Sequence, residues 1–388
     1  DGQPAPLRAM EGLPHLFPSL SKIKIEAFTW TSELQELLES VAGGHGPGQL
    51  PLQEVLFEFC RGSPCAKGMS QIDLMKVSNL QGLKTLGITL DPSDTTLQDP
   101  HPLQPILQHT QLERLYLETN FRACWQHEVP SPEDISQLLV SLPRLNFLHM
   151  LTFPAGLTMN VPSLSMLHIG MLRIQELHEL KQSLSRSSLP SLRAVVPDVL
   201  EMTILPSFSS DEACKLSPDL LKGFPLDLST TTLLVGSPRD VLDAEQLLLA
   251  VSSLVSVGFP MAEIKSLQLE NSIVAKSPVP PGVMSSLACV LPRLTGLTLV
   301  GYWDAEPMCV SPVRHAMLCF QSLKELLVIT SQEYYDKVFE VYDCLYDELE
   351  SWEGNGLLPA DLSVCAALLD VDSHGPLGSA EATSDEES

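Results

Sequence analysis

The sequence has few positive charges for its length. Lysine and arginine total 23, against 48 aspartates and glutamates, so the 388 residues carry a formal net charge of -25 at pH 7. A chain this acidic is repelled by the phosphates of nucleic acids and by anionic lipid headgroups. We therefore expect neither nucleic acid nor a membrane surface to be its main partner.

Long hydrophobic segments are also missing. The longest uncharged run in the most apolar part of the chain, residues 246–262, contains three serines and Pro260. It is shorter than the roughly 20 apolar residues of a membrane-spanning helix. The opening residues, DGQPAPLRAM, contain no hydrophobic signal core and no initiating methionine. We expect a piece of a longer protein, or a processed form, with a cytoplasmic or nuclear location.

Disulfide frameworks and catalytic motifs are absent from the sequence. The nine cysteines are odd in number and lack framework spacing. Several lie in apolar runs such as SLACVL and AMLCF, where a reduced cysteine behaves as a small apolar residue, so we expect free thiols. There is no phosphate-binding loop, dinucleotide fingerprint or nucleophile elbow, and the histidines are dispersed. We therefore predict no catalytic residue, no cofactor and no metal site.

What the sequence does contain is a recurring leucine pattern. In LERLYLETN, residues 112–120, apolar residues stand at offsets 0, 3 and 5 from the first leucine. This spacing fits neither a helix face nor a simple alternating strand. It recurs with starts at Leu20, Leu52, Leu83, Leu145, Leu164, Leu192, Ile264, Leu294 and Leu323. The copy at Leu192 is degenerate, because Pro197 replaces its third apolar residue.

Most of these starts are about 30 residues apart, the period of stacked supersecondary units. One interval of 19 residues, between Leu145 and Leu164, leaves little room for a helix. Another interval of 72 residues, between Leu192 and Ile264, has room for one or two further units around PLDLSTTTLLV.

The segments between copies have helix signals. In SPEDISQLLVSL, Ser131 is the expected N-cap and Pro132 the first helical residue, with acidic residues in the first turn. The same Ser-Pro opening recurs at Ser237 and Ser311. Five copies also have a proline two residues before their first apolar residue, which ends a helix and favours extended backbone. The unit is thus a strand, a turn, a helix and a second turn.

This pattern over residues 17–330 resembles the helix-containing class of leucine-rich repeat proteins. The resemblance implies an α/β leucine-rich repeat solenoid, with a curved parallel sheet inside and helices outside. In that family Asn or Cys stands at offset 8, and only Asn120 and Cys60 match here. Residues 1–16 would form an N-terminal extension to this irregular array.

The strands of such an array present the residues at offsets 2, 4 and 6 on the concave side of the sheet, which we call the repeat face. Aromatic, histidine, methionine and arginine side chains gather there in the middle of the array, and such residues are favoured at protein interfaces. We predict that a protein partner binds there; the alternatives are that a loop covers this face or that the alignment is wrong by one residue. The predicted binding residues are Arg114, Tyr116, Glu118, Phe147, His149, Leu151, Met166 and His168.

The C-terminal region differs from the repeats. Residues 331–352 have a wide apolar stripe opposite an acidic one, which predicts a helix that caps the array. DLSVCAALL, residues 361–369, also reads as helical, so we assign 331–369 to capping helices. Residues 370–381 nearly match a calcium-binding EF-hand loop, but His374 and Pro376 depart from it. We expect 370–388 to be a disordered acidic tail, with Ser384 a candidate kinase site.

An acidic, irregular array of this kind most resembles the substrate-recognition part of F-box/leucine-rich repeat proteins. That resemblance implies a protein substrate on the concave face and a cullin ubiquitin ligase recruited through an F-box, which this chain does not contain. The alternatives are a leucine-rich repeat scaffold or inhibitor with no link to ubiquitin, and a receptor that joins a cullin through an elongin-type box. A calcium-responsive module is a third, weaker reading.

Overall fold

The structure is a computed structural model that describes part of the chain in two compact units. Unit 1 contains residues 1–172, 176–198 and 224–227, and unit 2 contains residues 173–175, 199–223 and 228–388. The described residues are 21–27, 53–59, 74–75, 77, 80, 82–90, 103–119, 130–203, 221, 223–236, 244–256, 258–270, 281–300, 316–331, 350 and 362–369.

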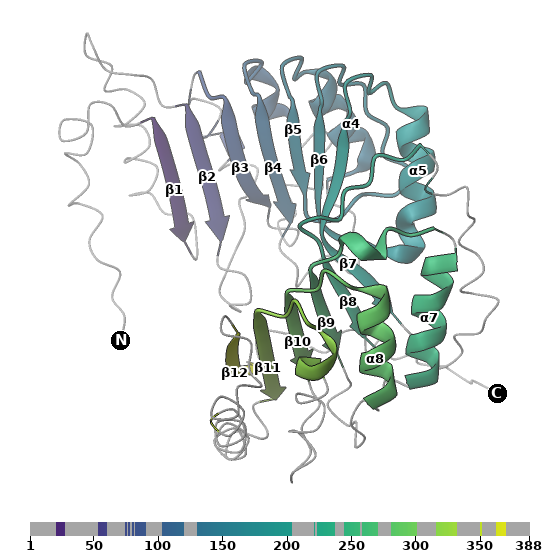
Figure 1. The fold of residues 1–388 in the computed structure, drawn as a ribbon. Helices are drawn as coiled ribbons and strands as arrows, with labels where there is room; N and C mark the ends of the chain where they lie inside the picture. The colour runs from purple at the N-terminus through teal and green to yellow at the C-terminus, as the bar shows by residue number, and fades with distance from the viewer. Residues whose placement is uncertain are drawn as a thin grey trace, which may run out of the picture. The chain divides into compact units, whose positions relative to one another are not determined.

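Both units are built on parallel strands that follow one another in chain order (Figure 1). The strands of unit 1 are β1 (Lys22–Ala27), β2 (Glu54–Phe59), β3 (Thr85–Leu90), β4 (Arg114–Thr119), β5 (Phe147–Met150) and β6 (Met166–Arg173). Those of unit 2 are β8 (Thr232–Gly236), β9 (Ser266–Glu270), β10 (Gly296–Val300), β11 (Glu325–Ser331) and β12 (Ser363–Leu369). Strand β7 (Ala194–Thr203) contributes its first half to unit 1 and its second half to unit 2.

The strand register places equivalent leucines of successive copies side by side. Leu115 of β4 pairs with Leu148 of β5, which pairs with Leu167 of β6, and all three are fully buried. The offset-0 residues Leu112 and Leu145 are buried as well, and each closes a turn: the amide of Leu112 donates to the His109 carbonyl, and that of Leu145 to the Leu142 carbonyl. Full burial of one such side chain is worth about 1.5–3 kcal/mol, so these rows form the core.

The helices follow the strands, as the sequence predicts. They are η3 (Gln104–Gln108), α4 (Pro132–Val140), η4 (Ile174–Glu176), α5 (Leu177–Arg186), α7 (Ala244–Ser256), η5 (Met261–Glu263) and α8 (Pro281–Val290), and α7 and α8 lie side by side in unit 2 (Figure 1). No helix in the described ranges is long and apolar enough to cross a membrane. Helix α4 buries Ile135, Leu138 and Leu139. Its predicted start is confirmed, because the amide of Asp134 donates to the Ser131 hydroxyl at 3.2 Å.

The two irregular intervals are resolved by the structure. Between β5 and β6 the described chain contains no helix, as the 19-residue interval predicts. The 72-residue interval contains β8, with Leu233 and Val235 buried and in register with Leu267 and Leu269 of β9.

The helical reading of residues 361–369 is wrong. Residues 363–369 form β12, which pairs in parallel with β11 over its whole length, beginning with Ser363 beside Glu325. Strand β11 would otherwise expose a row of unpaired amides and carbonyls, and pairing with it outweighs the local helix preference of Ala and Leu in this segment. The other C-terminal assignments, the helix of 331–352 and the tail of 370–388, lie outside the described residues apart from Ser331 and Glu350, as does the extension of 1–16.

Parallel strands in chain order, a repeat near 30 residues and a leucine row shared between copies define an α/β leucine-rich repeat solenoid fold. Each unit is a segment of this fold. Asn120 and Cys60, which match the family pattern at offset 8, lie outside the described residues.

The N-cap of α4 gives a direct test of the local structure. Replacing Ser131 with alanine removes the acceptor of the Asp134 amide and should destabilise α4 by about 1 kcal/mol. Ser131→Thr keeps a capping hydroxyl and serves as the control. Hydrogen exchange of the peptide that covers residues 132–140 measures the difference. Equal protection in wild type and Ser131→Ala would show that the cap contributes nothing.

Candidate functional site

The register brings the predicted binding residues of β4, β5 and β6 onto adjacent strands. Arg114 pairs with Phe147, which pairs with Met166 on β6. In the next row Tyr116 pairs with His149, which pairs with His168. The alignment that the sequence predicted is therefore confirmed, and a shift of one residue is excluded for these strands.

These residues differ in how much of each side chain reaches the surface. Arg114 and Met166 are exposed, Met166 to 37%, and Tyr116, Glu118, Phe147 and His168 are partly exposed. His149 is only 7% exposed, so a ligand can reach it only at the edge of the ring. The surface available to a partner therefore lies around His149 rather than on it.

Leu151 is not a surface residue, contrary to the prediction. It is 5% exposed and packs against Gly170 of β6. A Cβ at Gly170 would lie 3.1 Å from both the Cδ1 atom and the carbonyl oxygen of Leu151, so a larger residue at position 170 would require Leu151 to shift by a few tenths of an ångström. The Leu151 carbonyl also accepts a hydrogen bond from the Met171 amide at 2.7 Å. Leu151 is therefore held in place beside β6 and offers almost no surface to a partner.

Four rings form a closed set on the repeat face, which we call the ring quartet: Tyr116, Phe147, His149 and His168. The Tyr116 and Phe147 centroids are 5.0 Å apart, as are those of Phe147 and His168. Tyr116 lies 5.7 Å from His149, and the two imidazoles are 6.4 Å apart. These tilted arrangements are in the range where aromatic pairs attract. They hold side chains from three strands in one fixed arrangement.

Asp198 of β7 joins the ring quartet, and the sequence reading did not select it. Its Oδ2 atom lies 3.3 Å from His149 Nε2, and its Oδ1 atom lies 3.6 Å from His168 Nδ1. One carboxylate therefore links two imidazoles across three strands. Asp198 stands at offset 6 of the degenerate copy that starts at Leu192. Selecting offset 6 of every copy would have identified Asp198. This copy was not used in that way, because Pro197 breaks its apolar pattern.

The carboxylate of Asp198 is held in its ionised form. Burial alone raises the pKa of this carboxyl, but the hydrogen bonds and positive charge of His149 and His168 outweigh burial and lower the pKa well below its ordinary value. On the other side of the His149 ring, Nδ1 lies 3.6 Å from Glu118 Oε1. Nδ1 is buried and, among the described residues, has no hydrogen-bond partner. His149 thus stands between two carboxylates.

The arrangement is suited to binding rather than to bond making. The ring quartet contains no activated nucleophile beside a base of the kind that covalent catalysis requires. No group of three or more His, Cys, Asp or Glu in the described part of the chain is placed to hold a metal ion. The aromatic rings of the quartet and the half-exposed carboxylate of Asp198 are suited to contacting another molecule.

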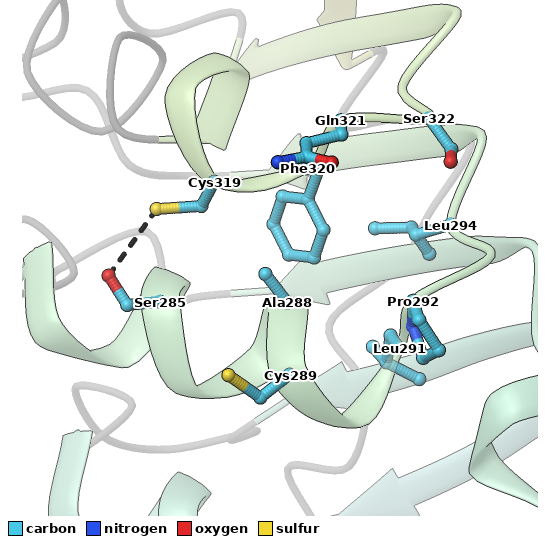
Figure 2. A pocket seen from close by; sticks show the side chains of 10 residues that line it. All are labelled: Ser285, Ala288, Cys289, Leu291, Pro292, Leu294, Cys319, Phe320, Gln321 and Ser322. Carbon is cyan, nitrogen blue, oxygen red and sulfur yellow. Dashed lines mark hydrogen bonds between the residues drawn. The ribbon is translucent and has the colours of Figure 1, made fainter.

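A pocket of about 320 Å³ lies in unit 2 (Figure 2). It is lined by side chains of α8, of the segment 291–294 that follows it and of residues 319–322, including the apolar Ala288, Leu294 and Phe320. The free thiol of Cys319 lies 3.4 Å from the Ser285 hydroxyl at one side of the pocket. The lining residues contain no charged group, so the pocket offers no recognition chemistry comparable to that of the ring quartet.

No family model and no curated protein matches the sequence. A search of solved structures finds a likeness to a chain in the crystal structure of a TLR13-ssRNA13 complex, with 14% sequence identity and a TM-score of 0.35. The matched region covers 84% of this chain and 38% of that chain, so this chain spans well under half of its length. The fold assignment rests on the strand order, register and spacing given above.

The lowered pKa of Asp198 predicts how its contribution to stability depends on pH. A carboxyl whose pKa is lower in the folded chain than in the unfolded chain stabilises the fold above its unfolded pKa, about 3.9 for aspartate. That stabilisation is lost as the pH falls toward the folded pKa. The amide of the Asp198→Asn variant cannot ionise, so the stability difference between wild type and this variant should shrink as the pH falls from about 5 to about 2.

Urea unfolding followed by circular dichroism at a series of pH values measures this difference. Glu179→Gln, which removes an exposed carboxylate from α5, is the matched control. A difference between wild type and Asp198→Asn that is the same at every pH would contradict the lowered pKa.

Proposed function

We propose that this chain is a protein-binding module and that a protein partner docks on the repeat face of unit 1. The observation that carries the proposal is the ring quartet, whose partly exposed Tyr116 and Phe147 are fixed by contacts from neighbouring strands. Rigid aromatic side chains lose little entropy on binding and are frequent among residues that dominate binding energy. Exposed Arg114 and Met166 flank the two rings and extend the contact surface.

We further propose that the module selects substrates for an F-box/leucine-rich repeat type of cullin ubiquitin ligase, in the cytoplasm or the nucleus. The repeat pattern and its resemblance to that class support this role. In that arrangement the array binds the substrate, and a segment before Asp1 binds the cullin through the adaptor. The net charge of -25 disfavours nucleic acid or anionic lipid as the partner. The free thiols of Cys289 and Cys319 are compatible with a reducing compartment.

The binding role can be tested by removing the two aromatic side chains. The double variant Tyr116→Ala, Phe147→Ala should reduce recovery of specific partners by roughly tenfold or more, because loss of an aromatic anchor costs about 1–2 kcal/mol or more per residue. The full-length protein is expressed with an affinity tag, and the proteins that copurify are quantified by mass spectrometry.

The matched control is Val140→Ala with Leu318→Ala. Both side chains are large, apolar and exposed, at 59% and 62%, and neither lies on the repeat face. Circular dichroism confirms that both double variants fold. Unchanged recovery of every specific partner in the aromatic variant would overturn docking at this face.

The ligase role has a separate test. If the role is correct, the full-length protein should copurify with a cullin and the F-box adaptor, and the aromatic double variant should keep these while losing substrate. Substrate levels should then rise in cells that carry the variant. Recovery of partners without any cullin would favour a scaffold or inhibitor, and recovery of elongin instead of the F-box adaptor would favour an elongin-linked receptor.

A further inference from the structure

We propose that the partner presents a basic segment, with an Arg or Lys side chain that docks against Asp198 beside the ring quartet. This inference rests on the proposed binding function of the repeat face. It adds the charge of the partner segment that docks there, which the repeat pattern does not specify.

The polar groups of this face are ordered along the strands. Arg114 stands near the start of β4, Tyr116 in the middle, and Glu118 toward the end of the strand. The carboxylates of Glu118 and Asp198 approach the same imidazole, that of His149, from its two nitrogens. Around the ring quartet, this face therefore has the exposed cation of Arg114 at the start of β4 and two carboxylates at His149.

Of the two carboxylates at His149, that of Asp198 is the one that a partner can reach. Its side chain is 49% exposed, whereas that of Glu118 is 16% exposed. A carboxylate has about four lone-pair sites, and the two imidazoles approach one oxygen each. Asp198 thus has acceptor capacity left on its exposed side, in a position where charge-assisted hydrogen bonds from Arg or Lys are stronger than neutral ones.

Aromatic rings stand close to this carboxylate. His168, which contacts Asp198, is within 5.0 Å of Phe147, and His149 is within 5.7 Å of Tyr116. A cation within about 6 Å of a Tyr or Phe ring is attracted by the ring face. An apolar stem of Lys or Arg that crosses the partly exposed Phe147 ring would bring its charged end toward Asp198.

The fixed charges around the ring quartet favour a cationic occupant. Arg114 and Glu118 on β4 and Asp198 on β7 together carry one net negative charge at neutral pH, and the exposed carboxylate of Asp198 is the part of that charge that a partner can contact.

A peptide selection tests the proposal without a known partner. Phage-displayed random 12-residue peptides are selected on the full chain at pH 7.5 and low salt, with counter-selection on the Tyr116→Ala, Phe147→Ala variant. We expect the enriched peptides to share an Arg or Lys. Fluorescence anisotropy then compares a synthetic enriched peptide with its analogue in which citrulline replaces Arg, or norleucine replaces Lys.

The expected result is a loss of affinity of roughly tenfold or more in two cases. These are the neutral peptide bound to wild type, and the basic peptide bound to the Asp198→Asn variant. Glu179→Gln, which changes the net charge equally but lies on α5, should bind the peptide as wild type does. That control separates a local effect of Asp198 from the overall negative charge of the chain.

The alternative outcomes are distinct. Enrichment of acidic or purely apolar peptides that still require Tyr116 and Phe147 would overturn the basic occupant and leave the docking face in place. Binding that is indifferent to Asp198→Asn and to the neutral analogue would do the same. If no peptide is enriched, or if all peptides bind the aromatic double variant as well as wild type, the proposal of docking at this face is refuted. The proposal of a basic docking segment is then refuted with it.

Discussion

A single repeat of this chain cannot bury its own leucines, and that constraint decides the rest of the structure. Leu115 points into the core, and within the sheet its two sides are covered by neighbouring copies. Leu86 of the previous copy lies on one side and Leu148 of the next copy on the other. Backbone pairing between parallel strands holds these leucines in the same row. A shift of one residue would turn the leucine row toward solvent, so burial fixes the register of every pair.

The fixed register also determines the repeat face. Once Leu115, Leu148 and Leu167 share a row, Tyr116, His149 and His168 must share the next row on the other face. The ring quartet is therefore positioned by leucines whose side chains lie on the opposite face of the sheet. Glycines adjust how closely neighbours approach: at Gly87 a Cβ would come within 2.9 Å of Leu56 Cδ2, and at Gly170 the missing side chain admits Leu151.

Much of this could be predicted from the sequence, because the signal repeats. The strands, the start of α4 and the row of Tyr116, His149 and His168 all follow from spacing and capping. Burial of Leu151 was not foreseeable, since it depends on a glycine 19 residues away in the sequence. Strand β12 was missed for a related reason, because pairing with β11 outweighs the local helix preference of residues 363–369.

Asp198 was missed because it stands in the least regular strand. Pro197, at offset 5 of its copy, cannot donate to a strand ladder, and the burial pattern changes within β7. Val195, Val196 and Pro197 are buried in succession, whereas after Asp198 burial alternates at Leu200 and Met202. Val195 pairs with Leu226 through an isolated bridge. The pairing of β7 with β8 begins only at Val199.

In a regular strand, the position of Asp198 would carry a residue that packs against the neighbouring copies. The irregular strand instead presents a half-exposed carboxylate to two histidines. Departures from a repeat cost stability and are expected where a protein carries function. Among the residues that the structure describes, Asp198 is the half-exposed carboxylate beside the ring quartet and it stands in an irregular strand, a combination that supports the recognition role proposed for it alongside its contribution to stability.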